Sequence, residues 1–271
     1  MSGSIERNLS ALAEAVDHSQ ASGLVHGLDP RAKILVTLLF VIAVTSFGKY
    51  EVSRLMPFAL YPAVLTGLSG VSPGRVLKRT LIAAPFVLFV GLFNPLFDRT
   101  PLLRIGPLVL TGGWMSFFSI IARSFLAVSA AVLLVFTTRF DSLCLGLERL
   151  GTPRVFVVQL LFLWRYIVLF MEEARRMVRA HTLRSWGNRP KISPKVFVSM
   201  TGTLLLRTLD RAGRVYRAMR ARGFEGEIRM LRPLSFSPSR DGLFLLVWGG
   251  YFLVCRLVNL PEFLFRAAAG P

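Results

Sequence analysis

The sequence predicts an all-α integral membrane protein that combines about five transmembrane helices with a cytoplasmic domain of long helices. The first observation is composition: of 271 residues, 53% are hydrophobic and 18% charged, against about 45–50% and about 25% in soluble domains. The second is that the apolar residues gather into blocks near the length that crosses a bilayer. The third is a formal net charge of +18, much of which falls in one region of the chain. These observations disfavour an ordinary soluble enzyme and exclude a disordered chain.

The first predicted membrane helix covers residues 32–47. Its start is well marked, because Asp29 can cap the helix and Pro30 suits its first turn. Arg31 and Lys33 follow, at the level where basic side chains meet lipid headgroups. The residues before this helix contain no apolar run of the length that a cleaved signal needs, so we expect the helix to remain as a membrane anchor.

Four further spans are predicted, at residues 55–69, 81–97, 114–137 and 242–260. The first two of these each contain two prolines, which bend helices but are tolerated where neighbouring groups satisfy the freed carbonyls. Arg123 and Arg256 fall inside the last two. A charge at mid-bilayer costs about 2.5–3.5 kcal/mol, so each arginine is a functional candidate unless it snorkels to the interface.

The segment 155–170 decides the topology. It is apolar over 16 residues, about 24 Å of helix, and falls short of a hydrocarbon core of roughly 30 Å. It also contains Gln159 and Arg165 and runs into a charged sequence without a break. We therefore expect one long helix, partly embedded and partly emergent, rather than a sixth span.

Basic residues near the predicted membrane ends indicate the orientation. The loop 70–80 and the long connection 138–240 are cationic, whereas the other loops are short and nearly balanced. Because basic loops stay in the cytoplasm, the N-terminus and this connection are expected inside and the C-terminus outside. The predicted organisation is a tail with four membrane helices (1–137), a cytoplasmic domain (138–240) and a final membrane helix (241–271).

Matching signals predict two long helices in the cytoplasmic domain. Thr152-Pro153 opens the first helix, and Gly187 closes it. Ser193-Pro194 opens the second in the same way, and Gly223 closes it. The second helix is amphipathic. Its apolar stripe is Leu205, Leu209, Ala212, Tyr216 and Met219, and its cationic stripe is Arg207, Arg211 and Arg214.

An arginine stands near the end of each long helix. The sequence reads Leu183-Arg184-Ser185 at the first end and Ala221-Arg222-Gly223 at the second, within a region, 165–232, that holds 16 Lys and Arg against 5 Asp and Glu. One interpretation is local, because cations near a helix C-terminus are favoured by about 0.3–1 kcal/mol through the helix dipole. Two matched ends on consecutive membrane-attached helices favour the other interpretation, a pair of docking points for a partner.

With these elements the chain resembles the T component, the membrane-embedded transducer, of energy-coupling factor transporters, and above all its CbiQ branch, which serves cobalt uptake. The resemblance covers nearly the whole chain: the run from His26 to Lys33, the hydrophobic block, the long helical pair and the final span. The family's signature is a pair of Ala-Arg-Gly-like motifs at the ends of two coupling helices. Ala221-Arg222-Gly223 matches the second motif fully, whereas Leu183-Arg184-Ser185 keeps only the central arginine of the first.

The resemblance implies a non-catalytic subunit of an ATP-driven importer in a bacterial-type inner membrane. Its partners would be two ABC-type ATPases similar to CbiO, a substrate-binding membrane subunit similar to CbiM, and a small accessory membrane subunit. The coupling helices would cross, and each arginine-bearing end would dock on one ATPase. Nucleotide-driven motion of these ends would then re-orient the substrate subunit. The cargo would be cobalt or nickel, with a vitamin as the alternative.

The residues point to no chemistry of the chain's own. There is no G-x-x-x-x-G-K-[ST] loop, so partner subunits would bind ATP, and no cofactor is expected in this chain. No metal site is expected, because the three histidines, His18, His26 and His181, are scattered and the two cysteines lie far apart.

Two other function classes can be weighed against the transducer. A membrane-integrated lipid enzyme would need clustered acidic or histidine catalysts. A membrane-tethered nucleic-acid binder would need stacking aromatics beside its basic face. The sequence offers neither feature, so we expect contact with membrane lipid but no nucleic-acid partner.

Overall fold

The computed structural model describes residues 25–48, 51–97, 101–105, 108–184, 193–226 and 236–258. Some predicted features lie outside these ranges. They are the tail before residue 25, the residues Ser185 and Gly187, and the last two residues of the predicted final span. Within them the chain is almost wholly helical, so the prediction of an all-α membrane protein is confirmed. One short antiparallel hairpin, β1 (Pro101–Ile105) and β2 (Leu108–Thr111), was not predicted.

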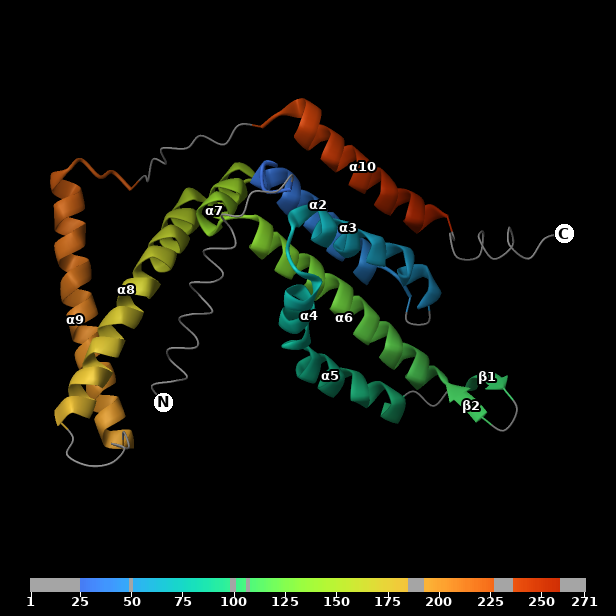
Figure 1. The fold of residues 1–271 in the computed structure, drawn as a ribbon, viewed down its shortest axis with the longest axis horizontal. Coiled ribbons are helices and arrows are strands. Elements are labelled where there is room, and N and C mark those ends of the chain that lie inside the picture. The colour runs from blue at the N-terminus through green and yellow to red at the C-terminus, as the bar shows by residue number, and fades with distance from the viewer. Residues whose placement is uncertain are drawn as a thin grey trace. The chain divides into compact units, whose positions relative to one another are not determined.

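The chain divides into two compact units, one made of Asp17–Gly146 with Leu234–Pro271 and the other containing Leu147–Pro233. The helices of the first unit are α2 (Pro30–Thr45), α3 (Leu60–Ser69), α4 (Pro73–Leu81), α5 (Ala84–Phe97), α6 (Gly112–Thr137), most of α7 (Phe140–Arg149) and α10 (Pro238–Leu257), with two 3-10 turns (Ser53–Leu55 and Pro57–Ala59) before α3 (Figure 1). The second unit contains α8 (Arg154–Arg184) and α9 (Pro194–Ala221).

Helix α2 is central to the first unit and packs against both α6 and α10 (Figure 1). Val36, Phe40 and Val44 recur every four residues on one of its faces, and all three side chains are fully buried. The hydrophobic run predicted over 32–47 is therefore a helix whose one face forms the core of this unit.

An aromatic cluster surrounds Phe40 and joins α2 to the elements beside it. The ring centroid of Phe40 lies 4.6 Å from that of Tyr61 and 5.4 Å from that of Phe252. The ring of Phe58 lies 6.1 Å away. Trp248 completes the cluster, with its ring centroid 4.8 Å from that of Tyr61 in an edge-on arrangement. Because lipid is as apolar as these side chains, close packing of this kind is what holds membrane helices together.

Two helices in the described ranges, α6 and α8, are long and apolar enough to cross a membrane. The span predicted over 114–137 is thus confirmed as the greater part of α6. The span predicted over 81–97 consists mostly of α5, which has 14 residues and reaches the length of a span only together with α4, from which it is bent by 54°. Pro85 lacks the N–H that would bond to the carbonyl of Leu81, so the helix breaks just before it.

The remaining predicted spans correspond to shorter or more polar helices. Helix α2 has 16 residues and α3 has 10, against about 20 for a crossing helix. Helix α10 has 20 residues but includes Arg240, Asp241 and Arg256. A multi-pass membrane protein is supported, while the number of five spans stays a prediction.

Helix α8 corrects the length argument made for residues 155–170. It is a continuous helix of 31 residues and contains an 18-residue window with a mean hydropathy of 1.8. The expectation of one long helix through this segment is therefore confirmed. Its length and composition would also allow it to cross a membrane, so full crossing stays open.

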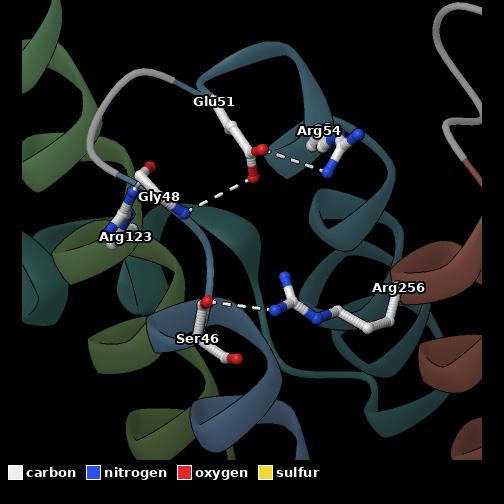
Figure 2. A network of polar contacts seen from close by, with 6 residues as sticks. All are labelled: Ser46, Gly48, Glu51, Arg54, Arg123 and Arg256. Carbon is white, nitrogen blue, oxygen red and sulfur yellow. Dashed lines mark hydrogen bonds and ion pairs between the residues drawn. The ribbon is translucent and has the colours of Figure 1, made fainter.

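The two arginines inside the predicted spans both turn to the end of α2 (Figure 2). Arg123 of α6 donates to the carbonyl oxygen of Gly48. Arg256 of α10 donates to the carbonyl oxygen of Ser46 at 3.2 Å, and its guanidinium lies 4.6 Å from the ring centroid of Phe47. The last carbonyls of a helix have no partner within the helix. Both arginines therefore have a structural role: Arg256 caps the end of α2 at Ser46, and Arg123 ties the segment just after α2, at Gly48, to α6.

Candidate docking site on the long helices

The second unit is an antiparallel pair of helices, α8 with 31 residues and α9 with 28. The predicted starts are confirmed: α8 begins directly after Pro153, and Ser193 caps α9 by accepting a hydrogen bond from the backbone N of Val196 at 3.4 Å. An aromatic contact shows that the two helices run antiparallel. Phe162, in the first half of α8, lies beside Phe224, just after the end of α9, with ring centroids 6.2 Å apart.

Glu173 links the two helices near their middle. Its carboxylate accepts hydrogen bonds from Arg207 of α9 and from Arg176, one turn further along α8, each at 2.9 Å. These two guanidinium groups, Arg207 first, hold the pKa of Glu173 below its usual range. Exposed ion pairs contribute little to stability. The link therefore sets the register of α9 along α8 rather than the strength of their association.

Helix α9 ends in a hydrogen-bond pattern that depends on glycine. The backbone N of Phe224 donates to the carbonyl of Met219 at 3.0 Å, and that of Gly223 donates to Arg220 at 3.1 Å. These are the two bonds of a Schellman motif. Gly223 has a φ of 80°, in the left-handed region. The predicted end at Gly223 is therefore confirmed, and the motif leaves Arg222 exposed at the tip of the helix.

Replacement of Gly223 by alanine is expected to destabilise the end of α9 by about 1–2 kcal/mol, the cost of a left-handed conformation for an L residue. No heavy atom lies within 4 Å of the position of the added Cβ, so backbone strain is the whole cost. Thermal unfolding followed by circular dichroism checks the prediction.

Gly213→Ala is the matched control, because Gly213 lies inside α9 with the same open space around it. Alanine there should leave the stability unchanged or raise it by about 0.5–1 kcal/mol. Equal behaviour of the two variants would contradict the strain argument.

The two arginines of the predicted motifs lie at opposite ends of the helix pair. Arg184 ends the described part of α8 and, like its neighbour Leu183, is exposed; Leu183 has 82% of its surface open. Ala221, Arg222 and Gly223 are exposed at the end of α9, about 42 Å of helix away. Neither arginine forms an ion pair with another described residue. The structure thus keeps the two motifs apart and leaves the charge of each available to a partner.

A groove of about 980 Å³ runs between α8 and α9. Four members of the predicted apolar stripe line it, namely Leu209, Ala212, Tyr216 and Met219, whereas Leu205 lies outside it. All three arginines of the cationic stripe also line the groove. Its α8 wall was not predicted, although Val155, Val158, Phe162, Tyr166 and Leu169 repeat at three- and four-residue steps, a pattern that could have revealed an apolar face.

The predicted helix-start element, Asp29, Pro30 and Arg31, lies in the first unit and begins α2 as expected. The Asp29 carboxylate caps the helix by accepting from the backbone N of Arg31 at 2.9 Å. Sequence reasoning placed Lys33 at the membrane interface and gave Asp241 no role, yet both are buried beside this element.

Metal-ligating side chains do not gather anywhere in the described ranges. No group of three or more His, Cys, Asp or Glu in them is placed to hold a metal ion. Cys144 and Cys255 are buried free thiols in helices of the first unit, as is usual for structural cysteines.

Comparison with known proteins gives one family and several relatives. The model of the CbiQ family, described as cobalt transport protein, matches residues 21–232 and so covers parts of both units. The energy-coupling factor transporter transmembrane protein EcfT of Heliobacterium modesticaldum is 29% identical over 85% of this chain and 92% of its own length. The EcfT of Thermanaerovibrio acidaminovorans is 28% identical over 79% and 84%. The cobalt transport protein CbiQ of Salmonella typhimurium is 28% identical over 40% and 48%.

Proposed function

The chain belongs to the CbiQ family of cobalt transport proteins, and on that premise we propose that it transmits ATP-driven motion from cytoplasmic ATPases to a substrate-binding membrane subunit. The family agrees with the resemblance seen in the sequence. Relatives that match most of the chain are named as transmembrane proteins of energy-coupling factor transporters. The chain is accordingly a multi-pass transmembrane component of such a transporter.

The observation that supports the coupling role is the placement of Arg184 and Arg222. Each is exposed at the end of a long helix, and neither pairs with a described residue of this chain. A guanidinium at such a tip can form a two-pronged pair with a carboxylate of a partner, stronger than a neutral hydrogen bond. In our proposal Leu183, Arg184 and Ser185 bind one ATPase, and Ala221, Arg222 and Gly223 bind the other.

The geometry of the helix pair supports two ATPase partners rather than one. The tips lie about 42 Å apart along α9, so a single groove on one partner could not receive both. Closing and opening of two ATPases would move the tips relative to each other, and the cytoplasmic domain of residues 138–240 would act as the lever between them. The proposed orientation is the one that the basic loops indicate, with the N-terminus in the cytoplasm.

The partners and cargo follow from the same premise. ATP is bound by ATPases similar to CbiO, and this chain carries no cofactor and no catalytic residue of its own. A substrate-binding membrane subunit similar to CbiM, with a small accessory membrane subunit, selects the cargo. Cobalt or nickel is the proposed cargo, and a vitamin is the alternative.

Purification of the tagged chain from its native membrane tests the proposal. We expect two copies of an ABC-type ATPase, or one of each of two, together with a substrate-binding membrane subunit. Reconstituted in vesicles, the complex should take up radioactive cobalt or nickel only when ATP is supplied, and uptake of a vitamin instead would select the alternative cargo. A chain that co-purifies with no ATPase contradicts the coupling role.

A further inference from the structure

The first turn of α2 contacts the stretch of chain that leads into the long-helix unit, Leu147–Pro233. The Nζ atom of Lys33 donates to the carbonyl oxygen of Thr137, the last residue of α6, at 2.9 Å. Further along, Gly146 packs so closely on α2 that an added Cβ would lie 3.0 Å from Ile34 and 3.2 Å from Pro30. Gly146 is the last residue before the long-helix unit begins. The chain is thus held to α2 up to the point where it enters that unit.

The same turn of α2 contacts the stretch of chain that leads out of the long-helix unit. The backbone N of Asp29 donates to Oδ1 of Asp241 at 2.8 Å. The other oxygen of Asp241 accepts from the backbone N of Ser237 at 2.8 Å, at the start of α10. One carboxylate therefore joins the N-termini of α2 and α10, where helix dipoles favour a negative charge.

Three charged side chains at this place are withdrawn from solvent. Lys33 is 4% exposed, Asp29 is 5% and Asp241 is 3%. Arg31 approaches Asp29 to 3.8 Å from the more exposed side, and the Lys33 amine is satisfied by the backbone carbonyls of Thr137 and His26. Buried charges are tolerated when they are paired and hydrogen-bonded, and removal of one leaves the others uncompensated. The group therefore has one strongly preferred arrangement.

We propose that Asp29, Lys33 and Asp241 form an anchor through which displacement of the long-helix unit enters the membrane helices. The anchor rests on the proposed function and adds to it the point of transmission. The chain that enters the long-helix unit is held to this turn of α2 at Thr137 and Gly146, and the start of α10 is held to it at Asp241. The buried face of α2 continues from that turn into the aromatic cluster. A displacement that reaches Gly146 or the start of α10 therefore acts on α2 directly. These are positioning residues, since none of them contacts ATP or cargo.

The test uses the complete transporter in vesicles and measures cargo uptake and ATP hydrolysis on the same sample. Lys33→Met removes the donor to Thr137 but keeps the side-chain length, and Asp241→Asn keeps the shape but cannot accept from both backbone N–H groups. We expect each variant to assemble with its ATPases and hydrolyse ATP within about two-fold of the wild type. Uptake per ATP hydrolysed should fall about ten-fold, because the buried partners are left unsatisfied.

Lys78→Met is the matched control, since Lys78 is an exposed lysine of α4 in the same unit. It should leave uptake per ATP unchanged, and Lys33→Arg, which keeps a donor and the charge, should restore part of the loss. Unchanged coupling in both Lys33→Met and Asp241→Asn would overturn the proposal. So would a loss of assembly in Lys33→Met, Asp241→Asn and Lys33→Arg alike, because the group would then serve folding alone. If the wild-type transporter shows no ATP-driven uptake, that result contradicts the proposed function itself.

Discussion

A chain that carries both Arg184→Glu and Arg222→Glu is expected to lose its ATPase partners while it keeps its fold. Both side chains are exposed and unpaired within the described part of the chain, so reversal breaks no internal contact. At the interface, each reversal removes a charge-assisted pair and opposes two like charges, at about 2–5 kcal/mol per site. The two reversals together should lower the affinity of the chain for its ATPase partners about a thousandfold or more. Co-purification of the ATPases and ATP-driven uptake should both disappear.

Arg175→Glu with Arg217→Glu is the matched control. Both residues are exposed on α8 and α9, neither pairs with a described residue, and the change in net charge is the same, but neither stands at a helix end. This double variant should keep most of its ATPase. If it loses the partner to the same extent, the attraction comes from the general positive charge of the region and the docking role of the two tips is wrong. Each single reversal at Arg184 or Arg222 should give a partial loss, as expected for two separate docking points.

Phe40→Ala is expected to be the most damaging single truncation in the membrane helices. Phe40 is fully buried and its ring lies within 6.1 Å of three other aromatic rings that come from other elements. Loss of a buried phenyl ring leaves a cavity and typically costs about 3–5 kcal/mol. The measurement is thermal unfolding in detergent, with the yield of folded chain as a second readout.

Phe86→Ala provides the comparison for Phe40→Ala. It deletes the same ring from α5, where Phe86 is 73% exposed within the chain. We expect a much smaller loss of stability, because lipid or detergent fills the space that the deleted ring leaves. An equal loss would show that the aromatic cluster contributes no more than any apolar residue in the membrane, and so would contradict its role as the core.

The long helices were the most predictable part of the fold. The start of α8 after Pro153, the cap at Ser193 and the end at Gly223 were all expected from local sequence and are all present. Capping works this well because it involves only hydrogen bonds between residues a few positions apart. The same reasoning placed the start of α2 at Asp29, whereas α6 was predicted from its apolar length.

The predictions were less accurate where the bounds of a helix were inferred from its apolar composition alone. The hydrophobic run 81–97 does not show that the helix breaks before Pro85 but continues through Pro95. The Gly106-Pro107 turn signal between the two strands was not used. For 155–170 the continuation of the helix to Arg184 was expected, but the count of unbroken apolar residues gave too short a length, because α8 has an 18-residue window apolar enough to cross. Hydropathy reports how apolar a segment is but not how straight it is.

The candidate site shows the same division between local and distant interactions. The arginine tips could be found from the sequence, because each motif is three residues long and lies beside a helix stop. The groove could be found only in part, since one wall is an amphipathic stripe and the other wall depends on how α8 faces α9. Phe224 joins the site only because the Schellman motif turns it back toward Phe162.

The sequence by itself determined the class of the protein, its family, its two long helices and the arginines at their tips, since these depend on composition and on neighbours along the chain. The tertiary structure alone decided that Arg256 and Arg123 hold the end of α2 and the segment just after it, and that Lys33 and Asp241 are buried at the start of α2. Their contacts join residues 75 and 210 positions apart in the first case and 104 and 212 in the second. No local propensity encodes such pairs, because they exist only when packing brings the helix ends together and burial makes an unpaired charge too costly to leave.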